Sequence, residues 1–283
     1  KLQKDVETEK ESLFSMLQKY ELTKDDHYEL MHYANTKNIQ FLSTAFDYES
    51  VDLLDEIGVP IFKISSGDLT TIPLIKYIAS KGKPIILSTG RSNMTDISEA
   101  VEAIKSITNI EIALLHCVSS YPAPQEDLNL KAIQTLKNSF MVPVGYSDHS
   151  LGSTAAIVAV TLGAKIVEKH ITLDSSSDGP DHKASMEPED FKRMVLKIRS
   201  IGDMLGSGIK KPTLMEAKEI QKGRKGVYAS KNITKGSKFD ESMFELLRPA
   251  NSISPNQLET LFGKIAAKDI TAMEGIEWDM VKD

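Results

Sequence analysis

Residues 142–172 read VPVGYSDHSLGSTAAIVAVTLGAKIVEKHIT, and this stretch decides the fold that the sequence predicts. Two apolar runs, 142–148 and 164–172, flank the segment STAAIVAVTLG, whose length and composition favour a helix that ends at Gly163. A strand, a helix and a second strand in this order are typical of parallel strands joined by a crossover helix. A histidine closes each run, His149 the first and His170 the second.

The same unit recurs along the preceding part of the chain. Helical segments alternate with apolar runs there, and one such helix is predicted to begin at Thr23, with Asp26 three positions on as the second half of a capping box. Six strands separated by helices predict a parallel β/α domain. The four further strands are expected at 39–46, 60–67, 84–90 and 110–117.

Polar residues follow every one of these apolar runs. One Ser-Thr pair after a strand is more often a helix N-cap than a binding site. Ligands sit at the carboxyl ends of parallel strands, where hydroxyls and backbone N–H groups suit phosphate oxygens. Six polar ends in succession therefore predict a site for a small, phosphorylated, hydroxyl-rich ligand. They are Ser43-Thr44, Ser65-Ser66-Gly67-Asp68, Ser88-Thr89-Gly90, Ser119-Ser120-Tyr121, Ser147-Asp148-His149 and Lys169-His170.

The two histidines are candidates for a metal site. A single histidine on a strand is usually a structural residue, but His149 and His170 close consecutive strands and are expected to project into the same mouth. Imidazoles without thiolates suit Mn²⁺, Fe²⁺ or Zn²⁺, and two ligands leave coordination positions open for water or substrate. His116 is a weaker candidate for a third ligand, because a turn into the following loop also explains it.

Composition narrows the class of protein. The 283 residues carry a formal net charge of −6, which argues against a nucleic-acid partner. Cys117 is the one cysteine, so an internal disulfide or a cysteine-based zinc cluster is excluded and a reducing compartment is favoured. No apolar stretch approaches the roughly 20 residues that span a bilayer, and the first fourteen residues are too polar for a signal peptide. We expect a cytoplasmic protein with no membrane partner.

The pattern changes after residue 205. We expect a first domain at 1–205, a linker at 206–222, and a small domain at 223–283 built from short β-like segments with many Gly and Pro. A helix within this small domain is predicted to begin after Ser254, with Pro255 at its first position.

Several motifs carry a resemblance to the sialic acid synthase family. They are FLSTAFDYESVDLLDEIGVPIFKISSGDLTTIPLI, GKPIILSTG, LLHCVSSYPAP, GYSDHS, VEKHIT and GPDHKASMEP. RKGVYASKNITKG and LLRPANSISPNQLETLFGK look like the C-terminal antifreeze-like (SAF) domain of that family. The resemblance implies a (β/α)8 TIM barrel and an enzyme that condenses phosphoenolpyruvate with an N-acetylated amino sugar, typically N-acetylmannosamine. The products are a nonulosonic acid and phosphate, and Mn²⁺ or Mg²⁺ assists.

The same resemblance implies roles for individual residues. His149 and His170 match the family's metal ligands, and Lys63 joins them as a residue at the reacting centre. Phosphoenolpyruvate is expected to contact Lys63, Thr44, Ser66, Ser88 and Ser147. The amino sugar is expected to contact Asp68, Ser119, Tyr121 and Asp181, although the family usually has an amide at Ser119 and several members have Glu at Asp68. Arg248 is expected to reach the sugar of the neighbouring protomer in a domain-swapped homodimer.

One departure leaves alternatives open. A closed barrel needs eight strands, whereas six are counted here, and the family begins with two β/α units that carry a glutamate and a phosphate-binding lysine before anything resembling residue 1. We expect this chain to lack both units. It is then an active synthase, a catalytically incomplete homologue that binds sugar or phosphate, or a phosphoenolpyruvate-condensing barrel of the 3-deoxy-2-keto sugar acid type. The acceptor is N-acetylmannosamine or a precursor of the legionaminic acid type, ahead of the pseudaminic type.

Overall fold

The computed structural model describes residues 7–8, 11–12, 15 and 18–283, in two compact units, Lys1–Gly206 and Ser207–Asp283. The first described elements are the short antiparallel strands β1 (Glu7–Thr8) and β2 (Glu11–Ser12). The rest of the polar N-terminal segment, for which a signal peptide was not expected, lies outside the described residues. No helix in the described ranges has the length and apolar character that crossing a membrane requires.

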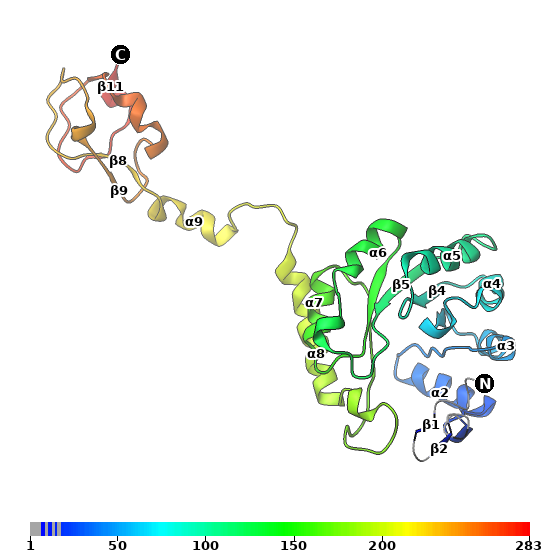
Figure 1. Ribbon diagram of the computed structural model, residues 1–283. Helices are drawn as coiled ribbons and strands as arrows, with labels where there is room; N and C mark the ends of the chain where they lie inside the picture. The colour runs from blue at the N-terminus through cyan, green and yellow to red at the C-terminus, as the bar shows by residue number, and fades with distance from the viewer. Residues whose placement is uncertain (1–6, 9–10, 13–14, 16–17) are drawn as a thin grey trace. The chain divides into compact units, whose positions relative to one another are not determined.

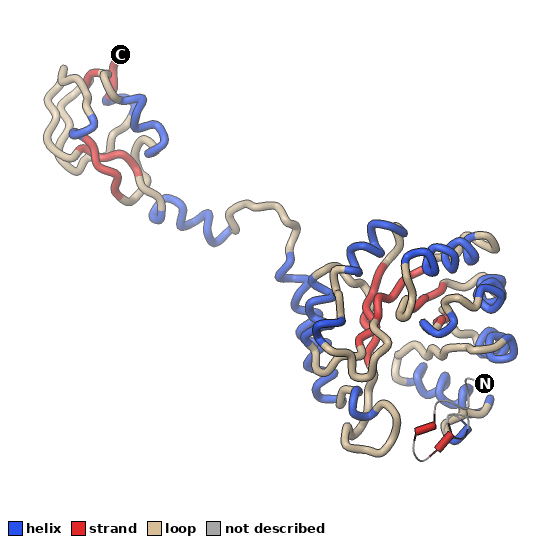
Figure 2. The backbone as a smooth tube through the Cα atoms, viewed as in Figure 1, coloured by secondary structure: helices blue, strands red, loops and turns tan. Residues whose placement is uncertain are grey.

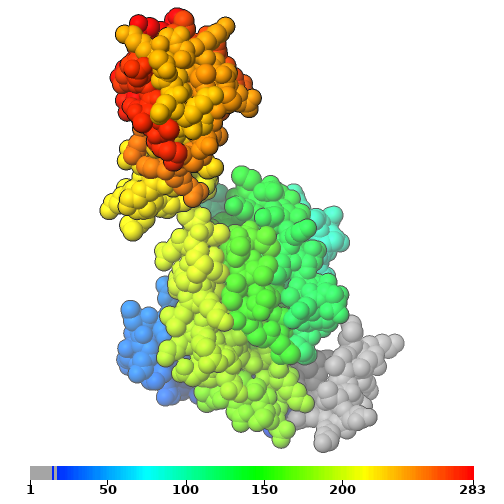
Figure 3. Space-filling view, turned by 90° about the vertical axis from the view of Figure 1, so that its left-hand side faces the viewer, coloured from blue at the N-terminus to red at the C-terminus, as the bar shows by residue number. Residues whose placement is uncertain are grey.

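A five-stranded parallel sheet organises the first unit. Its strands pair in chain order, and an arc of helices lies outside them (Figures 1 and 2). The strands are β3 (Phe62–Ile64), β4 (Ile85–Ser88), β5 (Ile112–Cys117), β6 (Val144–Asp148) and β7 (Val167–Lys169). The helices are α2 (Lys24–Thr36), α3 (Tyr48–Ile57), α4 (Ile72–Ser80), α5 (Met94–Lys105), α6 (Ala132–Phe140), α7 (Thr154–Thr161) and α8 (Pro188–Leu205). Helices α7 and α8 pack against each other, and α8 forms the yellow-green surface in Figure 3.

The sheet is curled. Strands β3 and β7 lie at opposite ends of the strand order, yet Lys63 Nζ of β3 is 3.6 Å from Glu168 Oε2 of β7. A flat sheet would separate these two strands by about four inter-strand spacings of 4.8 Å each. A parallel bridge from Ile171 to Met186 continues the pairing beyond β7. The predicted parallel β/α domain of the barrel class is therefore confirmed.

The two faces of the sheet have different chemistry because successive side chains on a strand point in opposite directions. One set is buried against the helices in a continuous core. The alternate set faces the concave side and is polar toward the carboxyl ends of the strands. The core set includes Phe62, Ile64, Ile85, Leu87, Leu114, Val144 and Tyr146, and the concave set includes Lys63, Ser88, Ser147 and Glu168.

The first predicted strand was wrong. Within 39–46, Thr44 alone pairs with the sheet, through a single parallel bridge to Lys63. A strand assignment needs a ladder of consecutive pairs, and among the described residues this segment has a partner on one side only. The other five strands are confirmed, although each is shorter than predicted.

The predicted helix starts are confirmed only in part. The capping box of Thr23 and Asp26 is present at the start of α2, as predicted. In helix α5 the N-cap is Asn93, whose side chain accepts bonds from the Thr95 and Asp96 N–H groups at 2.8 and 3.2 Å. Thr95 and Asp96 are thus inside the first turn.

The second unit contains one α-helix, short 3₁₀ helices and two small antiparallel ladders. Helix α9 (Leu214–Gly223) occupies part of the segment expected as a linker. The ladders pair β8 (Gly226–Ala229) with β9 (Phe244–Leu247) and β10 (Ile265–Ala266) with β11 (Val281–Lys282). The helix expected after Ser254 is a 3₁₀ helix, Pro255–Leu261, and the Ser254 side chain makes no capping bond. The core of this unit includes Val227, Phe239, Ile253, Leu261 and Ile276.

Candidate active site

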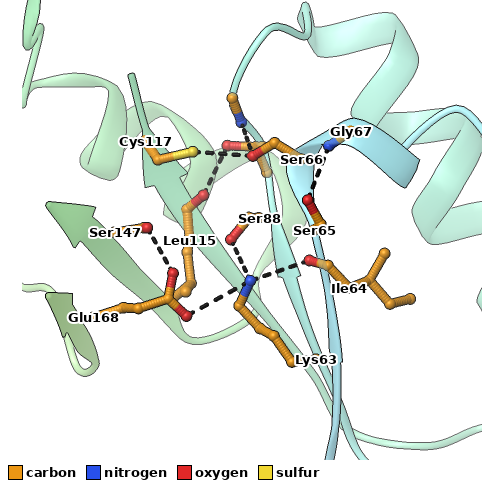
Figure 4. A network of polar contacts seen from close by, with 12 residues as sticks. Lys63, Ile64, Ser65, Ser66, Gly67, Ser88, Leu115, Cys117, Ser147 and Glu168 are labelled. Carbon is orange, nitrogen blue, oxygen red and sulfur yellow. Dashed lines mark hydrogen bonds and ion pairs between the residues drawn. The ribbon is translucent and has the colours of Figure 1, made fainter. Parts of the chain in front are cut away.

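A band of polar side chains crosses the concave face near the carboxyl ends of the strands (Figure 4). Lys63 donates to Ser88 Oγ at 2.8 Å and to the Ile64 carbonyl at 3.2 Å, and it faces Glu168 Oε2 at 3.6 Å. Ser147 donates to the other oxygen of Glu168 at 2.6 Å. Four strands thus supply one connected network, with a cation held between a hydroxyl and a carboxylate.

A second cluster lies beside this band. Ser66 Oγ lies 3.1 Å from the Cys117 sulfur and accepts a bond from the Gly90 N–H at 2.9 Å (Figure 4). Gly90 allows this close packing, because a Cβ there would lie 2.4 Å from Ser119 Oγ and 2.6 Å from the Cys117 sulfur. The structure therefore brings Ser66 and Ser119 together, as the sequence predicted for polar residues at neighbouring strand ends.

The two histidines meet at the ends of β6 and β7. Their ring centroids are 5.3 Å apart with an interplanar angle of 69°. The Nδ1–H of His149 donates to the Val118 carbonyl at 2.7 Å, which leaves the lone pair on Nε2. Burial lowers the pKa of His149, and the neighbouring His170 lowers it further, so the neutral ring that binds metals is favoured.

This arrangement fits a divalent ion with an open coordination sphere. In many metal sites a ligating histidine donates its other N–H to a backbone carbonyl or a carboxylate. His149 does so to Val118, and Nδ1 of His170 lies 3.7 Å from Asp181 Oδ2. Among the described residues no cluster of three or more His, Cys, Asp or Glu side chains could enclose an ion. The histidine pair by itself would leave the remaining coordination positions of an ion to water or substrate.

Tyr121 and Asp181 border the histidines. The Tyr121 ring lies 4.3 Å from the His149 ring and 5.6 Å from the His170 ring, measured between centroids. Burial raises the pKa of Tyr121, and nearby Arg91 acts in the opposite direction, so the phenol stays protonated and able to donate. The phenol and the carboxylate beside the histidine pair can offer a hydrogen-bond donor and an acceptor to a sugar.

Three other expected site residues are placed less directly. Thr44 is held beside Lys63 by their backbone bridge. Asp68 lies in a 3₁₀ turn after β3, where burial raises its pKa despite a weak bond from Thr71 at 3.4 Å. Arg248 belongs to the second unit, where it precedes a cis proline bond at Pro249.

The structure rejects His116 as a third metal ligand. Alternation along β5 turns His116 to the helix side of the sheet, where its Nε2–H donates to the Leu128 carbonyl at 2.8 Å and its ring stacks on Tyr146. A position at the end of a strand is not enough to assign a ligand. Successive side chains alternate between the two faces of the sheet, so only every second residue points to the concave face.

Sequence reasoning missed Glu168 and Cys117 as site residues, and it named Gly90 only as part of a polar strand end. The sequence does contain a pattern that could have revealed Glu168. It is a carboxylate two positions before His170, and residues two apart on a strand point to the same face of the sheet. In the same way, Cys117 lies two positions before Ser119 and could have been placed on the same face. For Gly90 no local pattern revealed the close approach of three side chains from other strands.

Comparisons with known proteins identify the family of the chain. The model of the NeuB family matches residues 1–210, and the model of the SAF domain matches residues 224–282. An N,N'-diacetyllegionaminic acid synthase of Campylobacter jejuni is 48% identical over 92% of this chain and 78% of its own length. A synthase of the same name from Legionella pneumophila is 38% identical over 99% of this chain and 80% of its own. The crystal structure of an N-acetylneuraminic acid synthetase from Leptospira borgpetersenii, in complex with citrate, superposes with a TM-score of 0.69 at 40% identity, covering 73% of this chain and 72% of that one.

Proposed function

The chain belongs to the NeuB family and carries a SAF domain, and from that membership we propose that it is a nonulosonic acid synthase. Such an enzyme is a transferase that forms a C–C bond between phosphoenolpyruvate and an N-acetylated amino sugar, releasing phosphate. The observation that carries the proposal is the position of Lys63, a cation 12% exposed within a row of serine hydroxyls on the concave face that also bears the histidine pair.

Phosphoenolpyruvate suits this row because it carries a carboxylate and a phosphate. The Lys63 ammonium would offset one of these charges, and the Ser66 and Ser88 hydroxyls would donate hydrogen bonds to their oxygens, while Ser147 would exchange its bond to Glu168 for one to the substrate. Thr44 adds a further hydroxyl beside Lys63. Holding two substrates in the right orientation can contribute several kcal/mol to the rate, so these residues act chiefly by binding and alignment.

His149 and His170 would hold the divalent ion, Mn²⁺ or Mg²⁺, through their free ring nitrogens. When bound, the ion supplies Lewis-acid polarisation of a substrate oxygen. Tyr121, Asp181, Asp68 and Ser119 would bind the hydroxyl and acetamido groups of the amino sugar. The Val118 carbonyl keeps His149 in the tautomer that this arrangement needs.

The acceptor is proposed to be a 6-deoxy-di-N-acetyl amino sugar, the precursor of N,N'-diacetyllegionaminic acid. Two relatives that bear the name of this synthase support the choice over N-acetylmannosamine. Phosphoenolpyruvate is an intracellular metabolite, so we place the reaction in the cytoplasm.

The domain organisation extends this proposal. Residues 1–205 would form the catalytic domain, 206–222 the connection and 223–283 the SAF domain. The protein would work as a homodimer in which Arg248 of one protomer binds the amino sugar held by the other barrel. Arginine suits this role because its planar fork donates to several oxygens at once and remains charged.

The test is an assay of phosphate release from phosphoenolpyruvate with three acceptors: N-acetylmannosamine, the legionaminic precursor and the pseudaminic precursor. We expect turnover with the legionaminic precursor at the highest kcat/KM. Turnover with the pseudaminic precursor only would refute the acceptor assignment. No turnover with any acceptor, in the presence of Mn²⁺, would favour a homologue that binds sugar or phosphate without catalysis.

A further inference from the structure

A buried ion pair lies behind the two histidines. Lys169 Nζ is 3.0 Å from Asp148 Oδ2, and the two side chains are 1% and 0% exposed. Asp148 directly precedes His149, and Lys169 directly precedes His170. Neighbouring residues on a strand face opposite sides, so the ion pair lies on the helix side of the sheet while the histidines lie on the concave side.

The pair is part of a hydrogen-bonded cluster that includes the turn after β6. Asp148 Oδ1 accepts bonds from the Ser150 N–H at 2.9 Å and the Ser150 hydroxyl at 2.7 Å. Lys169 also donates to the Ser150 carbonyl. Asp148 and Lys169 are register partners in the β6–β7 ladder as well. Side-chain and backbone contacts therefore both join the two strands at the position next to each histidine.

Packing alone does not explain this pair. Taking two charges out of water is costly, and well-packed apolar residues of similar volume often give equal or greater stability. The best-supported role of buried ion pairs is to select one geometry among several that the chain could adopt. The two histidines are held unequally. His149 has its own bond to Val118, whereas the one polar contact of the His170 ring among the described residues is the longer one with Asp181, at 3.7 Å. The other contacts of the His170 ring are with the rings of Tyr121 and His149.

We propose that Asp148 and Lys169 are positioning residues, which set the separation and orientation of His149 and His170 so that both can bind one divalent ion. The inference rests on the metal role in the proposed function. The pair joins the strand ends, the strand ends set the Cα positions of the histidines, and the ring of His170 follows the backbone that Lys169 holds.

The experiment measures Mn²⁺ binding by the full chain without turnover, through the loss of the free Mn²⁺ signal in electron paramagnetic resonance, with melting temperature as a separate measure of stability. Four variants are compared. Lys169→Met leaves Asp148 charged and unpaired, Asp148→Asn with Lys169→Met removes both charges, and Lys169→Arg keeps the pair. Lys81→Met, which breaks the Lys81–Asp52 pair between the end of α4 and α3, is the matched control.

We expect Lys169→Met to lower both the melting temperature and the Mn²⁺ affinity, the latter at least about tenfold, the range seen when groups supporting metal ligands are lost. The double variant should recover melting temperature because no charge is left unpaired, yet its affinity should stay at least about tenfold weaker. Lys169→Arg and Lys81→Met should bind Mn²⁺ as the unmodified chain does.

Recovery of full Mn²⁺ affinity in the double variant would overturn the inference, because the pair would then serve stability alone. If the double variant does not fold, Ser150→Ala decides, since it keeps both charges and removes one bond to Asp148. That folded variant should bind Mn²⁺ at least about threefold more weakly, and unchanged affinity would equally overturn the inference. If the unmodified chain binds no Mn²⁺, the metal role in the proposed function fails and this inference fails with it.

Discussion

Lys63 Nζ on β3 lies 3.6 Å from Glu168 Oε2 on β7, although three strands separate β3 from β7 in the sheet. This contact exists only because the sheet curls, and it places a cation and a carboxylate in one polar network on the concave face. The carboxylate, itself bonded to Ser147, holds the ammonium in place within this network.

Replacing Lys63 tests the anion site. Lys63→Met keeps much of the length of the side chain and removes its charge, so kcat/KM for phosphoenolpyruvate should fall at least about 100-fold, equivalent to roughly 2.7 kcal/mol. Lys83→Met is the control, because Lys83 pairs with Asp55 of α3 outside the polar network. Steady-state kinetics with varied phosphoenolpyruvate measure the effect. Similar losses in both variants would contradict a specific role for Lys63.

Removing the metal or either ligand tests the histidine pair. Chelation should abolish turnover, and added Mn²⁺ or Mg²⁺ should restore it. His149→Ala and His170→Ala should each weaken Mn²⁺ binding by at least about tenfold, because one ligand alone holds the ion poorly. His116→Gln should bind Mn²⁺ normally, since His116 lies on the other face of the sheet. Titration with Mn²⁺ measures the affinity of all three variants. Unchanged affinity in both alanine variants would contradict the assignment of His149 and His170 as metal ligands.

Gly90 is expected to tolerate no side chain. In Gly90→Ala the new methyl group would meet Ser119 Oγ, Cys117 Sγ and Ser66 Oγ at 2.4, 2.6 and 2.9 Å. Overpacking of this kind typically costs about 1–3 kcal/mol, and we expect that loss in the free energy of unfolding together with a raised KM for phosphoenolpyruvate.

Gly202→Ala is the matched control for Gly90→Ala. Gly202 lies in α8, where an added Cβ would meet no atom within 4 Å, so alanine there should stabilise the protein by about 0.5–1 kcal/mol. Urea unfolding of both variants gives the comparison. Equal stability of the two alanine variants would show that the contacts around Gly90 relax without cost.

His116 predicts a pH dependence of stability. Burial lowers its pKa below the ordinary value of 6.5, and the bond to Leu128 only partly offsets this. As pH falls through about 6.5 the unfolded chain takes up a proton before the folded one does. The contribution of His116 is therefore fully present above that pH and is lost on acidification toward the folded pKa.

The pKa of His149 is also lowered, so both histidines contribute to the loss of stability at low pH. The variant His116→Gln removes only the contribution of His116 and so isolates it. Urea unfolding between about pH 7 and about pH 5 should show a smaller loss of unfolding free energy for His116→Gln than for the unmodified protein. Parallel curves would mean that His116 protonates equally well in both states.

Arg248 tests the dimer. Arg248→Ala and His149→Ala should each be inactive alone, whereas a mixture of the two should recover activity. In a mixed dimer one composite site combines an intact barrel with an intact Arg248. Phosphate release after mixing measures the recovery. Demonstrated subunit exchange without recovery would show that Arg248 serves its own barrel or none.

Local pattern was enough for much of the fold. Apolar runs of strand length, separated by helical segments, predicted the five parallel strands β3–β7, and the Thr23–Asp26 box predicted where α2 begins. The approach of His149 and His170 was also predictable, because consecutive parallel strands end at the same edge and both histidines directly follow the last residues of their strands. These features depend on contacts between residues close in sequence or on the regular succession of strands and helices along the chain.

Tertiary structure alone decided the rest. The Lys63–Glu168 contact depends on the curvature of the whole sheet, and the buried Asp148–Lys169 pair depends on which face of each strand the helices cover. His116 stands near the end of a strand, as the expected ligands do. It is not a ligand because its side chain lies on the helix side of the sheet. Sequence periodicity places a side chain on one of two faces, but which face is concave and which is covered follows only when the strands pair, curl and pack against helices.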